Sequence, residues 1–272
     1  MFRKLIKFIL PVFIINIINV ILKRNIKIIG NYSSWEKALE NSTGYNDDKI
    51  FQKLKESFLK ILDGKAQYER DSVLFYEEKI NYSLIQIINE IRLKLKKKID
   101  ILDFGGSFAS IYFQNKSILK NNFFCLWSVI EQKNIVKYVN SKKIYKKLIS
   151  LYNNLYFYPS LKNFYKCHNP DLVIFSGVLQ YLTQPHDVLL SLIEKKVKYI
   201  LILRTPLHDR QEQIMVQKVP KSIYKSSYPI RIFNEKDFLN FFKNHNYKRV
   251  KINFRDEIIA NYRHKNILFK LK

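Results

Sequence analysis

Apolar side chains in the first part of the chain recur every three or four positions, which is the spacing that places them on one face of a helix. This pattern predicts that residues 31–98 form a helical cap, with a glycine turn between its first two helices. Segments with the helical spacing are residues 35–40, the stretch from Asn46 to Gly64, and residues 82–98.

From residue 99 onward, short apolar runs alternate with helical stretches. Apolar runs without polar alternation are typical of strands that are buried on both faces. Strands that alternate with helices imply a parallel sheet covered by helices on both sides. The predicted strands are residues 99–104, 124–130, 155–158, 171–175, 197–203, 247–254 and 264–271. The helices expected between them are residues 111–119, 134–152, 185–195 and 235–244.

The last two strands have no long crossover between them, which predicts an antiparallel hairpin at the edge of the sheet. No element is predicted over residues 204–233, which contain three prolines. The expected fold class is therefore α/β. It combines a Rossmann-like, mostly parallel sheet over residues 99–272 with an antiparallel C-terminal edge hairpin and an N-terminal helical cap.

The first thirty residues form an apolar and basic leader that contains no acid. Residues 8–22 are apolar apart from two asparagines, and this run is shorter than the roughly 20 residues that a spanning helix needs. No small-residue cleavage site follows the run, as a signal peptide would require. We expect residues 1–30 to form a helix at the surface of an anionic membrane. A single span and a helix packed on the domain stay open as alternatives.

The chain has 48 Lys+Arg against 23 Asp+Glu, a net charge of +25. No Lys/Arg block is longer than Lys96–Lys98, and the abundant Ile, Asn, Tyr and Phe share A/T-rich codons with Lys. Coding bias on solvated faces and a functional basic field are therefore both open interpretations, and charge alone does not predict a nucleic-acid partner. No set of His, Cys, Asp and Glu has the spacing of metal ligands, so no metal is expected.

A glycine pair follows the first predicted strand. Asp103-Phe104-Gly105-Gly106-Ser107 occupies the turn into the next helix and holds two of the chain's six glycines. Small residues at this turn let the backbone approach a ligand, and the helix start presents free N–H groups. Ser107 and Ala109 stand where a dinucleotide fingerprint has further glycines, so pyrophosphate is a less favoured ligand.

Polar residues also mark the neighbouring strands. Glu131, followed by Gln132, ends the second strand, where an acid accepts the two hydroxyls of a ribose; a solvated glutamate is the alternative. Asp171 opens the fourth strand, and Ser176 follows its end. Because ligands of open α/β sheets bind outside the carboxyl ends of the strands, these strand ends are expected to converge on one crevice.

A glycine loop, an acid after the second strand and an aspartate at the fourth resemble the class I S-adenosylmethionine-dependent methyltransferases. Within that superfamily, the chain is similar to a bacterial methyltransferase family known mainly from surface-polysaccharide and O-antigen gene clusters. The matching residues run in colinear order over about residues 30–240. They are Gly30–Trp35, Tyr45, Tyr68–Phe75, Asp103–Ser107, Tyr112–Asn115, Trp127, Val129–Gln132, Ser176, Leu179–Leu182, Arg204–Pro206, Val216–Pro220, Tyr224 and Ser227–Pro229.

The resemblance implies S-adenosylmethionine as cofactor and a glycan or glycolipid as acceptor at the cytoplasmic face of the membrane. It implies that the glycine loop holds the methionine part of the cofactor and that the acid after the second strand holds the ribose. Arg70 is expected to hold the cofactor carboxylate, or to pair with a neighbouring acid instead. The implied cofactor-binding residues are Asp103, Gly105, Gly106, Ser107, Glu131, Gln132, Ser176 and Arg70.

Methyl transfer is an in-line displacement, in which the protein positions the acceptor and removes its proton. His208 is the candidate base, Arg204 lies on the same expected rim, and Tyr228 is a candidate wall of the acceptor pocket. A solvated histidine and a core tyrosine are the structural alternatives.

Two other functions stay open. One is a nucleic-acid methyltransferase that uses the net +18 of residues 101–272, although no RNA-binding module is recognisable. The other is a non-catalytic scaffold of a glycan pathway, suggested by Ala109 and Leu203, which stand where the similar family usually has Gly and Asp.

The leader leads to a first prediction. The full chain is expected to float with liposomes that contain anionic lipid and to stay behind with neutral phosphatidylcholine, because its basic residues bind lipid phosphates. Replacing the six leader Lys and Arg residues by Gln is expected to abolish the difference. Flotation that is independent of anionic lipid would contradict the interfacial helix.

Overall fold

The computed structural model describes residues 26–44, 48–70, 73–120, 125–220 and 226–272. The leader lies outside these residues except for its end, where strand β1 (Lys27–Tyr32) takes the place of the last residues of the expected helix. Over the described part of the chain, no helix is long and apolar enough to cross a membrane. Residues 27–30 therefore belong to a strand that pairs with β9.

Five parallel strands form the centre of the sheet, in the spatial order β6-β5-β4-β7-β8. The mostly parallel α/β sheet predicted from the alternating pattern is confirmed. The strands are β4 (Ile99–Phe104), β5 (Cys125–Ile130), β6 (Leu155–Tyr158), β7 (Leu172–Ser176) and β8 (Tyr199–His208).

The C-terminal strands extend the sheet in the antiparallel sense. Strand β13 (Tyr262–Leu271) lies antiparallel beside β8, and β11 (Tyr247–Val250) and β12 (Glu257–Ile259) both pair with β13. The expected edge hairpin is thus confirmed, with the last strand of the chain inserted between β8 and β11.

An unexpected antiparallel extension lies beyond the parallel strands. Strands β9 (Gln213–Val219) and β10 (Ser226–Asn234) form a hairpin, and β1 pairs with β9; we call β1, β9 and β10 the upper sheet. Pairing of β7 with β8 ends at Leu203, and β10 pairs with the same edge of β8 from Leu207. The prolines in this segment hid the hairpin, because proline argues against a strand interior.

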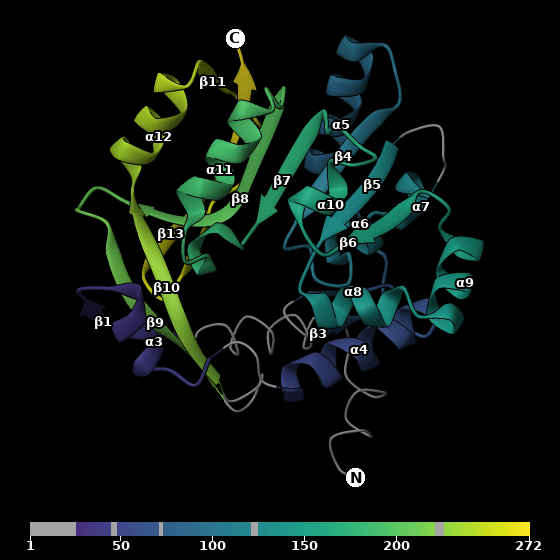
Figure 1. Cartoon of the computed structure of the whole chain (residues 1–272), viewed down its shortest axis with the longest axis horizontal. Helices are drawn as coiled ribbons and strands as arrows, with labels where there is room; N and C mark the ends of the chain where they lie inside the picture. Colours follow the sequence, from purple (N-terminus) through teal and green to yellow (C-terminus); the bar gives the residue numbers. More distant parts are fainter. Residues whose placement is uncertain (1–25, 45–47, 71–72, 121–124, 221–225) are drawn as a thin grey trace.

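Helices cover both faces of the parallel sheet (Figure 1). The helix expected over residues 111–119 is broken at Asn115, whose side chain binds the Ile111 carbonyl and accepts the Asn81 N–H. The helix expected over residues 134–152 is likewise two helices, separated before Ser141, which caps the second in an extended conformation. The helices after β4 are α6 (Ser110–Gln114), α7 (Lys116–Leu119), α8 (Lys133–Val139), α9 (Lys142–Leu151), α10 (Leu161–Phe164), α11 (Pro185–Glu194) and α12 (Glu235–Asn244).

The N-terminal cap is only partly helical. It contains the three helices expected from the pattern, α3 (Trp35–Glu40), α4 (Asp48–Leu62) and α5 (Tyr82–Leu95). It also contains a hairpin of β2 (Tyr68–Arg70) and β3 (Val73–Phe75), which the short runs of mixed polarity did not indicate. In Figure 1, α3 lies beside the strands of the upper sheet, which are drawn at the lower left, and α4 lies below the parallel strands.

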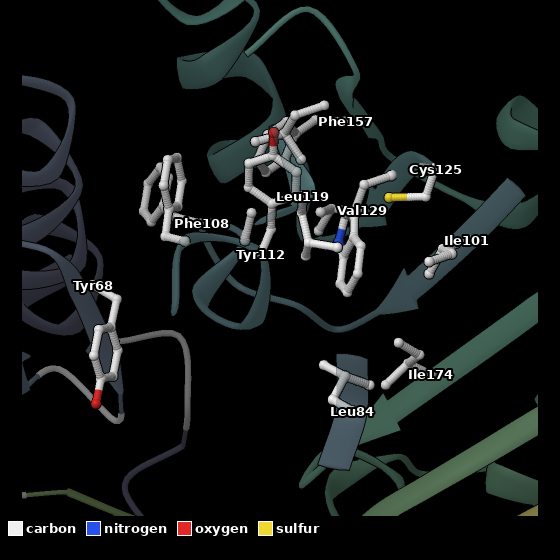
Figure 2. Close-up of a cluster of buried hydrophobic side chains, with 14 of the residues drawn as sticks. Tyr68, Leu84, Ile101, Phe108, Tyr112, Leu119, Cys125, Val129, Phe157 and Ile174 are labelled. Carbon is white, nitrogen blue, oxygen red and sulfur yellow. The ribbon is translucent and has the colours of Figure 1, made fainter. Parts of the chain in front are cut away.

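Two hydrophobic cores sit on opposite faces of the sheet. One joins α4, α5, α6 and α8 to strands β4 and β5, and Figure 2 shows Phe108, Tyr112 and Val129 within it. The other lies beneath α11 and α12, where the rings of Phe242 and Phe269 stack with centroids 3.7 Å apart. Phe108 also stacks on Phe58 of α4, so the cap is part of the first core.

Asn154, which is fully buried, joins three segments of the first core. Its side-chain oxygen accepts the Tyr112 hydroxyl at 2.6 Å, and its amide donates to the carbonyls of Leu119 at 2.7 Å and Cys125 at 3.1 Å. Truncating this side chain would leave buried polar groups without partners. Such orphans cost about 1–3 kcal/mol.

Asn154→Ala is therefore expected to lower the free energy of unfolding by about 3 kcal/mol, measured by urea denaturation. The neighbouring exposed residue provides a matched control, and Asn153→Ala is expected to change stability by less than about 0.5 kcal/mol. Equal effects of the two substitutions would contradict the bridging role of Asn154.

Candidate active site

The loop after β4 requires its two glycines for packing. A Cβ on Gly105, which has φ +69°, would overlap the side chain of Val178. A Cβ on Gly106 would overlap the carboxyl group of Asp103. The loop therefore lies close against both the end of β4 and the segment after β7.

Two further residues of this loop adopt left-handed backbone without being glycine. Ser107 has φ 55° and Ala109 has φ 62°. Such a conformation costs a non-glycine residue roughly 1–2 kcal/mol, so positions 107 and 109 are ones where glycine would be less strained. The methyl of Ala109 is fully buried in the first core, so the space for it exists and the strain lies in the backbone.

Asp103 lies behind the glycine loop with no exposed surface. Burial raises the pKa of its carboxyl to about 7, the negative charge of Glu131 adds to this rise, and the indole of Trp127 and the charge of Arg204 oppose it. Among the described residues, no donor lies within hydrogen-bonding distance and angle of either carboxyl oxygen. A positive charge brought to the loop would therefore favour the ionised form of the Asp103 carboxyl.

Glu131 connects the glycine loop to the end of β5. Its Oε1 accepts the Ser107 N–H at 3.3 Å, and its Oε2 accepts the N–H of Gln132. Burial raises the pKa of the Glu131 carboxyl, and the two backbone hydrogen bonds act against that rise. The side chain of Gln132 is exposed at the start of α8. Glu131 and Gln132 therefore follow the end of β5, beside the loop that follows the end of the neighbouring parallel strand β4.

Arg204 adopts a left-handed conformation, φ 54°, inside strand β8. The register between β8 and β13 shifts here, so that Leu203 and Arg204 together oppose Asn266, which is the pattern of a β-bulge. The Arg204 N–H donates to Asn266 Oδ1 at 3.0 Å. Its carbonyl accepts from Gln180 Nε2 at 3.3 Å and from His264 Nδ1 at 3.1 Å.

The guanidinium of Arg204 covers the carboxyl end of β7. Its Nε donates to Ser176 Oγ and its Nη2 donates to the Ser176 carbonyl, both at 3.3 Å. A Cβ on Gly177, which has φ +65°, would lie 3.3 Å from Nη2. The charge of Arg204 also lowers the pKa of Asp103. Arg204, Ser176 and the glycine loop therefore lie together at the carboxyl edge of the parallel strands.

A second polar cluster lies between the upper sheet and the 3-10 turn η1 (Leu179–Tyr181). The Tyr181 hydroxyl donates to Gln217 Oε1 at 3.0 Å, and Gln217 Nε2 donates to the Tyr228 hydroxyl at 3.1 Å. The rings of Tyr181 and Tyr228 meet edge to face at 5.2 Å. The sequence indicated Tyr228 as a candidate wall, but its link to Tyr181 through the buried amide of Gln217 becomes apparent only once β9 and β10 are paired.

His208 and Arg70 occupy other places than the sequence suggested. His208 lies four residues beyond Arg204, at the last residue of β8. It lines a hollow that none of the glycine-loop residues lines, so it is not positioned as a base at the loop. Arg70 donates to Gln114 Oε1 at 3.0 Å on α6, while its neighbour Glu69 accepts the Ser110 hydroxyl. Arg70 thus pairs with an amide rather than with Glu69, and Asp71 lies outside the described residues.

The residues that hold Arg204 could not be recognised from the sequence. Asn266 and His264 come from the last strand, and Gln180 comes from η1, so they are far apart in the chain. The only local signal was Arg204-Thr205-Pro206, whose proline disfavours a regular strand. The bulge that brings these residues together is a tertiary feature.

No family model and no curated protein matches the chain, but solved structures resemble it. A Burkholderia thailandensis 1,6-didemethyltoxoflavin-N1-methyltransferase with bound S-adenosylhomocysteine matches at 10% identity, 83% of this chain, 90% of that chain and TM-score 0.41.

Two other structures resemble the chain to a similar degree. The N-terminal domain of EvdMO1, solved in the presence of SAH and D-fucose, matches at 10% identity, 84% of this chain, 97% of that chain and TM-score 0.46. CalS10, an amino pentose methyltransferase from Micromonospora echinaspora solved with SAM, matches at 6% identity, 69% of this chain, 89% of that chain and TM-score 0.43. These similarities are too low to transfer a residue role or a substrate.

The raised pKa of Asp103 leads to a prediction about stability. The folded-state pKa of about 7 lies above the ordinary value of 3.8, so the stabilising contribution of Asp103 is fully present below about pH 4 and is lost as the pH rises through 7. Asn at this position does not titrate. The stability of Asp103→Asn relative to the unaltered chain is expected to increase by about 2–3 kcal/mol between pH 5 and pH 8, in urea unfolding at each pH.

Glu194→Gln, an exposed substitution on α11, is the control, and its stability difference is expected to stay nearly constant over that range. A pH-independent difference for Asp103→Asn would mean that the carboxyl is ionised throughout.

Proposed function

We propose that this protein is an S-adenosylmethionine-dependent methyltransferase that methylates a sugar hydroxyl of a surface polysaccharide or glycolipid intermediate. The observation that carries the proposal is the meeting of the glycine loop, Glu131 and the Ser176–Arg204 pair at the carboxyl ends of β5, β4 and β7. Open α/β sheets bind their ligands at such strand ends.

The residues at this site fit the cofactor. The glycine pair brings the backbone close to the crevice, and Glu131 keeps lone pairs for the ribose hydroxyls beyond the two backbone N–H groups it accepts. Asp103, buried and lacking a hydrogen bond of full geometry, offers a negative charge whose ionisation a nearby cation favours. When bound, S-adenosylmethionine supplies an electrophilic methyl group on a positively charged sulfur.

The protein's own contribution is to position the acceptor. Arg204 and Ser176 form one polar wall, and Tyr181 of η1 together with Gln217 and Tyr228 of the upper sheet forms another. Hydrogen bonds from these groups would align a sugar hydroxyl with the methyl carbon, and alignment supplies much of the rate of an in-line displacement. Tyr228 and Arg204 are the side chains we assign to contact with the acceptor, and His208 lies too far along β8 for that role.

The location of the protein is a separate part of the proposal. Residues 1–30 would hold the enzyme at the inner face of the cytoplasmic membrane, where glycolipid intermediates are accessible. The support is the acid-free basic and apolar pattern of the leader.

The test begins with calorimetric titration of S-adenosylmethionine. Gly106→Ala is expected to weaken binding at least tenfold, because the added Cβ overlaps the Asp103 carboxyl and displaces the loop. Gly64→Ala is the control for strain away from the site: Gly64 has φ +71°, so alanine strains the backbone there, but a Cβ meets no atom within 4 Å, and the variant is expected to bind normally. Mass spectrometry of surface glycans from cells with and without the gene is then expected to show loss of one methyl group from one sugar.

Two results would overturn the proposal. A folded protein that binds S-adenosylmethionine no more tightly than millimolar would exclude the cofactor. Bound cofactor with no change in the surface glycans would favour the scaffold alternative.

A further inference from the structure

A polar hollow of about 530 Å³ opens at the far end of β8, away from the glycine loop. Its walls are the end of β8 and the two residues that follow it, the turn between β12 and β13, and the first residues of β1 and β9. The side chains that matter for its chemistry are His208, Asp209, Arg210, Asn261, Tyr262 and Arg263.

The hollow lies on the same face of the upper sheet as the tyrosine cluster. Alternate residues of a strand share a face, so Gln213, Met215 and Gln217 of β9 point the same way. Gln213 lines the hollow and Gln217 holds the two tyrosines. Between them, the Tyr262 hydroxyl donates to the sulfur of Met215 at 3.1 Å. The two sites are therefore neighbours along one surface, since Ile28 of β1, which lines the hollow, is the cross-strand partner of Gln217.

The opposite face of the upper sheet is covered by α3. Trp35 of this helix lies under the guanidinium of Arg231, 5.6 Å from the ring centroid, and Arg231 also forms an ion pair with Glu212. That face is thus packed, and the face with the hollow is the one on which a ligand can extend from the acceptor site.

The charged side chains around the hollow favour the binding of an anion. Arg210 and Arg263 are exposed, and within the described residues neither guanidinium has a carboxylate within ion-pair distance. The buried Nε2 of His208 also lacks a hydrogen-bond partner within the same residues. Asp209 supplies the single acid of the lining, so the two arginines leave a net formal charge of +1. Guanidinium groups bind carboxylate and phosphate oxygens in a two-pronged geometry.

We propose that this hollow binds the anionic group, a phosphate or a carboxylate, of the glycan that accepts the methyl group. The proposal rests on the proposed function. Arg210 and Arg263 bind the anion, and Asp209 and Asn261 bind neighbouring sugar hydroxyls. Because Ile28, which lines the hollow, pairs with Gln217 of the tyrosine cluster, one acceptor can place its charged group in the hollow and its methylated hydroxyl at Tyr228.

The test compares three probes on the full chain: glucose 1-phosphate, glucuronic acid and glucose, by isothermal titration. Glucose is expected to bind at least tenfold more weakly than the better of the two anionic sugars, and the identity of that sugar distinguishes phosphate from carboxylate. The double variant Arg210→Gln/Arg263→Gln is expected to lose this preference. The control Lys248→Gln/Arg249→Gln, which removes the same charge from exposed positions on β11, is expected to keep it.

The anion site would be overturned if glucose and the anionic sugars bound equally well. It would also be overturned if the control variant lost the preference for the anionic sugar to the same extent as the double arginine variant. Failure of the proposed function is distinguishable, because anion binding that depends on the arginines persists without any methyl transfer. Where methyl transfer is measured, the double variant is expected to raise the KM for the glycan at least tenfold with kcat within twofold and unchanged affinity for S-adenosylmethionine. An unchanged KM would also overturn the anion site.

Discussion

The bulge at Arg204 is the constraint on which the candidate site depends. Strand β8 pairs with β7 as far as Leu203 and with β10 from Leu207, so its backbone must change direction between them. The left-handed residue at the bulge makes that change and turns the guanidinium over Ser176. Such a conformation costs roughly 1–2 kcal/mol, and the hydrogen bonds that the Arg204 backbone forms with Asn266, Gln180 and His264 offset that cost.

The same strand separates two environments. Below the bulge, the parallel strands place Asp103 and Glu131 around a tightly packed glycine loop, where burial raises the pKa of both carboxyls. Beyond it, the upper sheet and η1 present neutral hydrogen-bonding groups, Gln217 and the two tyrosines. A positively charged cofactor suits the first environment and a neutral sugar hydroxyl suits the second, because an ion needs a charged partner in a water-poor site whereas a hydroxyl needs only hydrogen bonds.

The high positive charge of the chain has a limited structural role. Among the described residues, the positive charges next to the candidate site and the proposed anion site are Arg204 at the bulge and Arg210 and Arg263 around the hollow. Many of the lysines lie on helix surfaces such as those of α8 and α9. The position of a charged side chain within the fold, rather than the net charge of the chain, therefore decides which charges can recognise a ligand.

Local patterns in the sequence were enough to predict the elements that are regular and continuous. The buried strands β4, β5 and β7, the helix α12 and the glycine loop all have unbroken apolar or small-residue signals, and the structure has them within one or two residues of the expected bounds. The β9–β10 hairpin was missed because its prolines contradict the local propensity of strands. The breaks in two of the predicted helices were missed, because the helical spacing of apolar residues continues on both sides of Asn115 and Ser141.

The sequence by itself determined that an α/β sheet carries Asp103, Gly105, Gly106 and Glu131 at the ends of its strands, since those residues adjoin the apolar runs that form the strands. Only the tertiary structure decided that Gln217 links Tyr181 to Tyr228, that Arg204 covers Ser176, and that His208 belongs to a separate hollow. The physical reason is that these contacts join residues far apart in the chain. They exist only after β8 has bent and the upper sheet has paired, and no local spacing encodes that register.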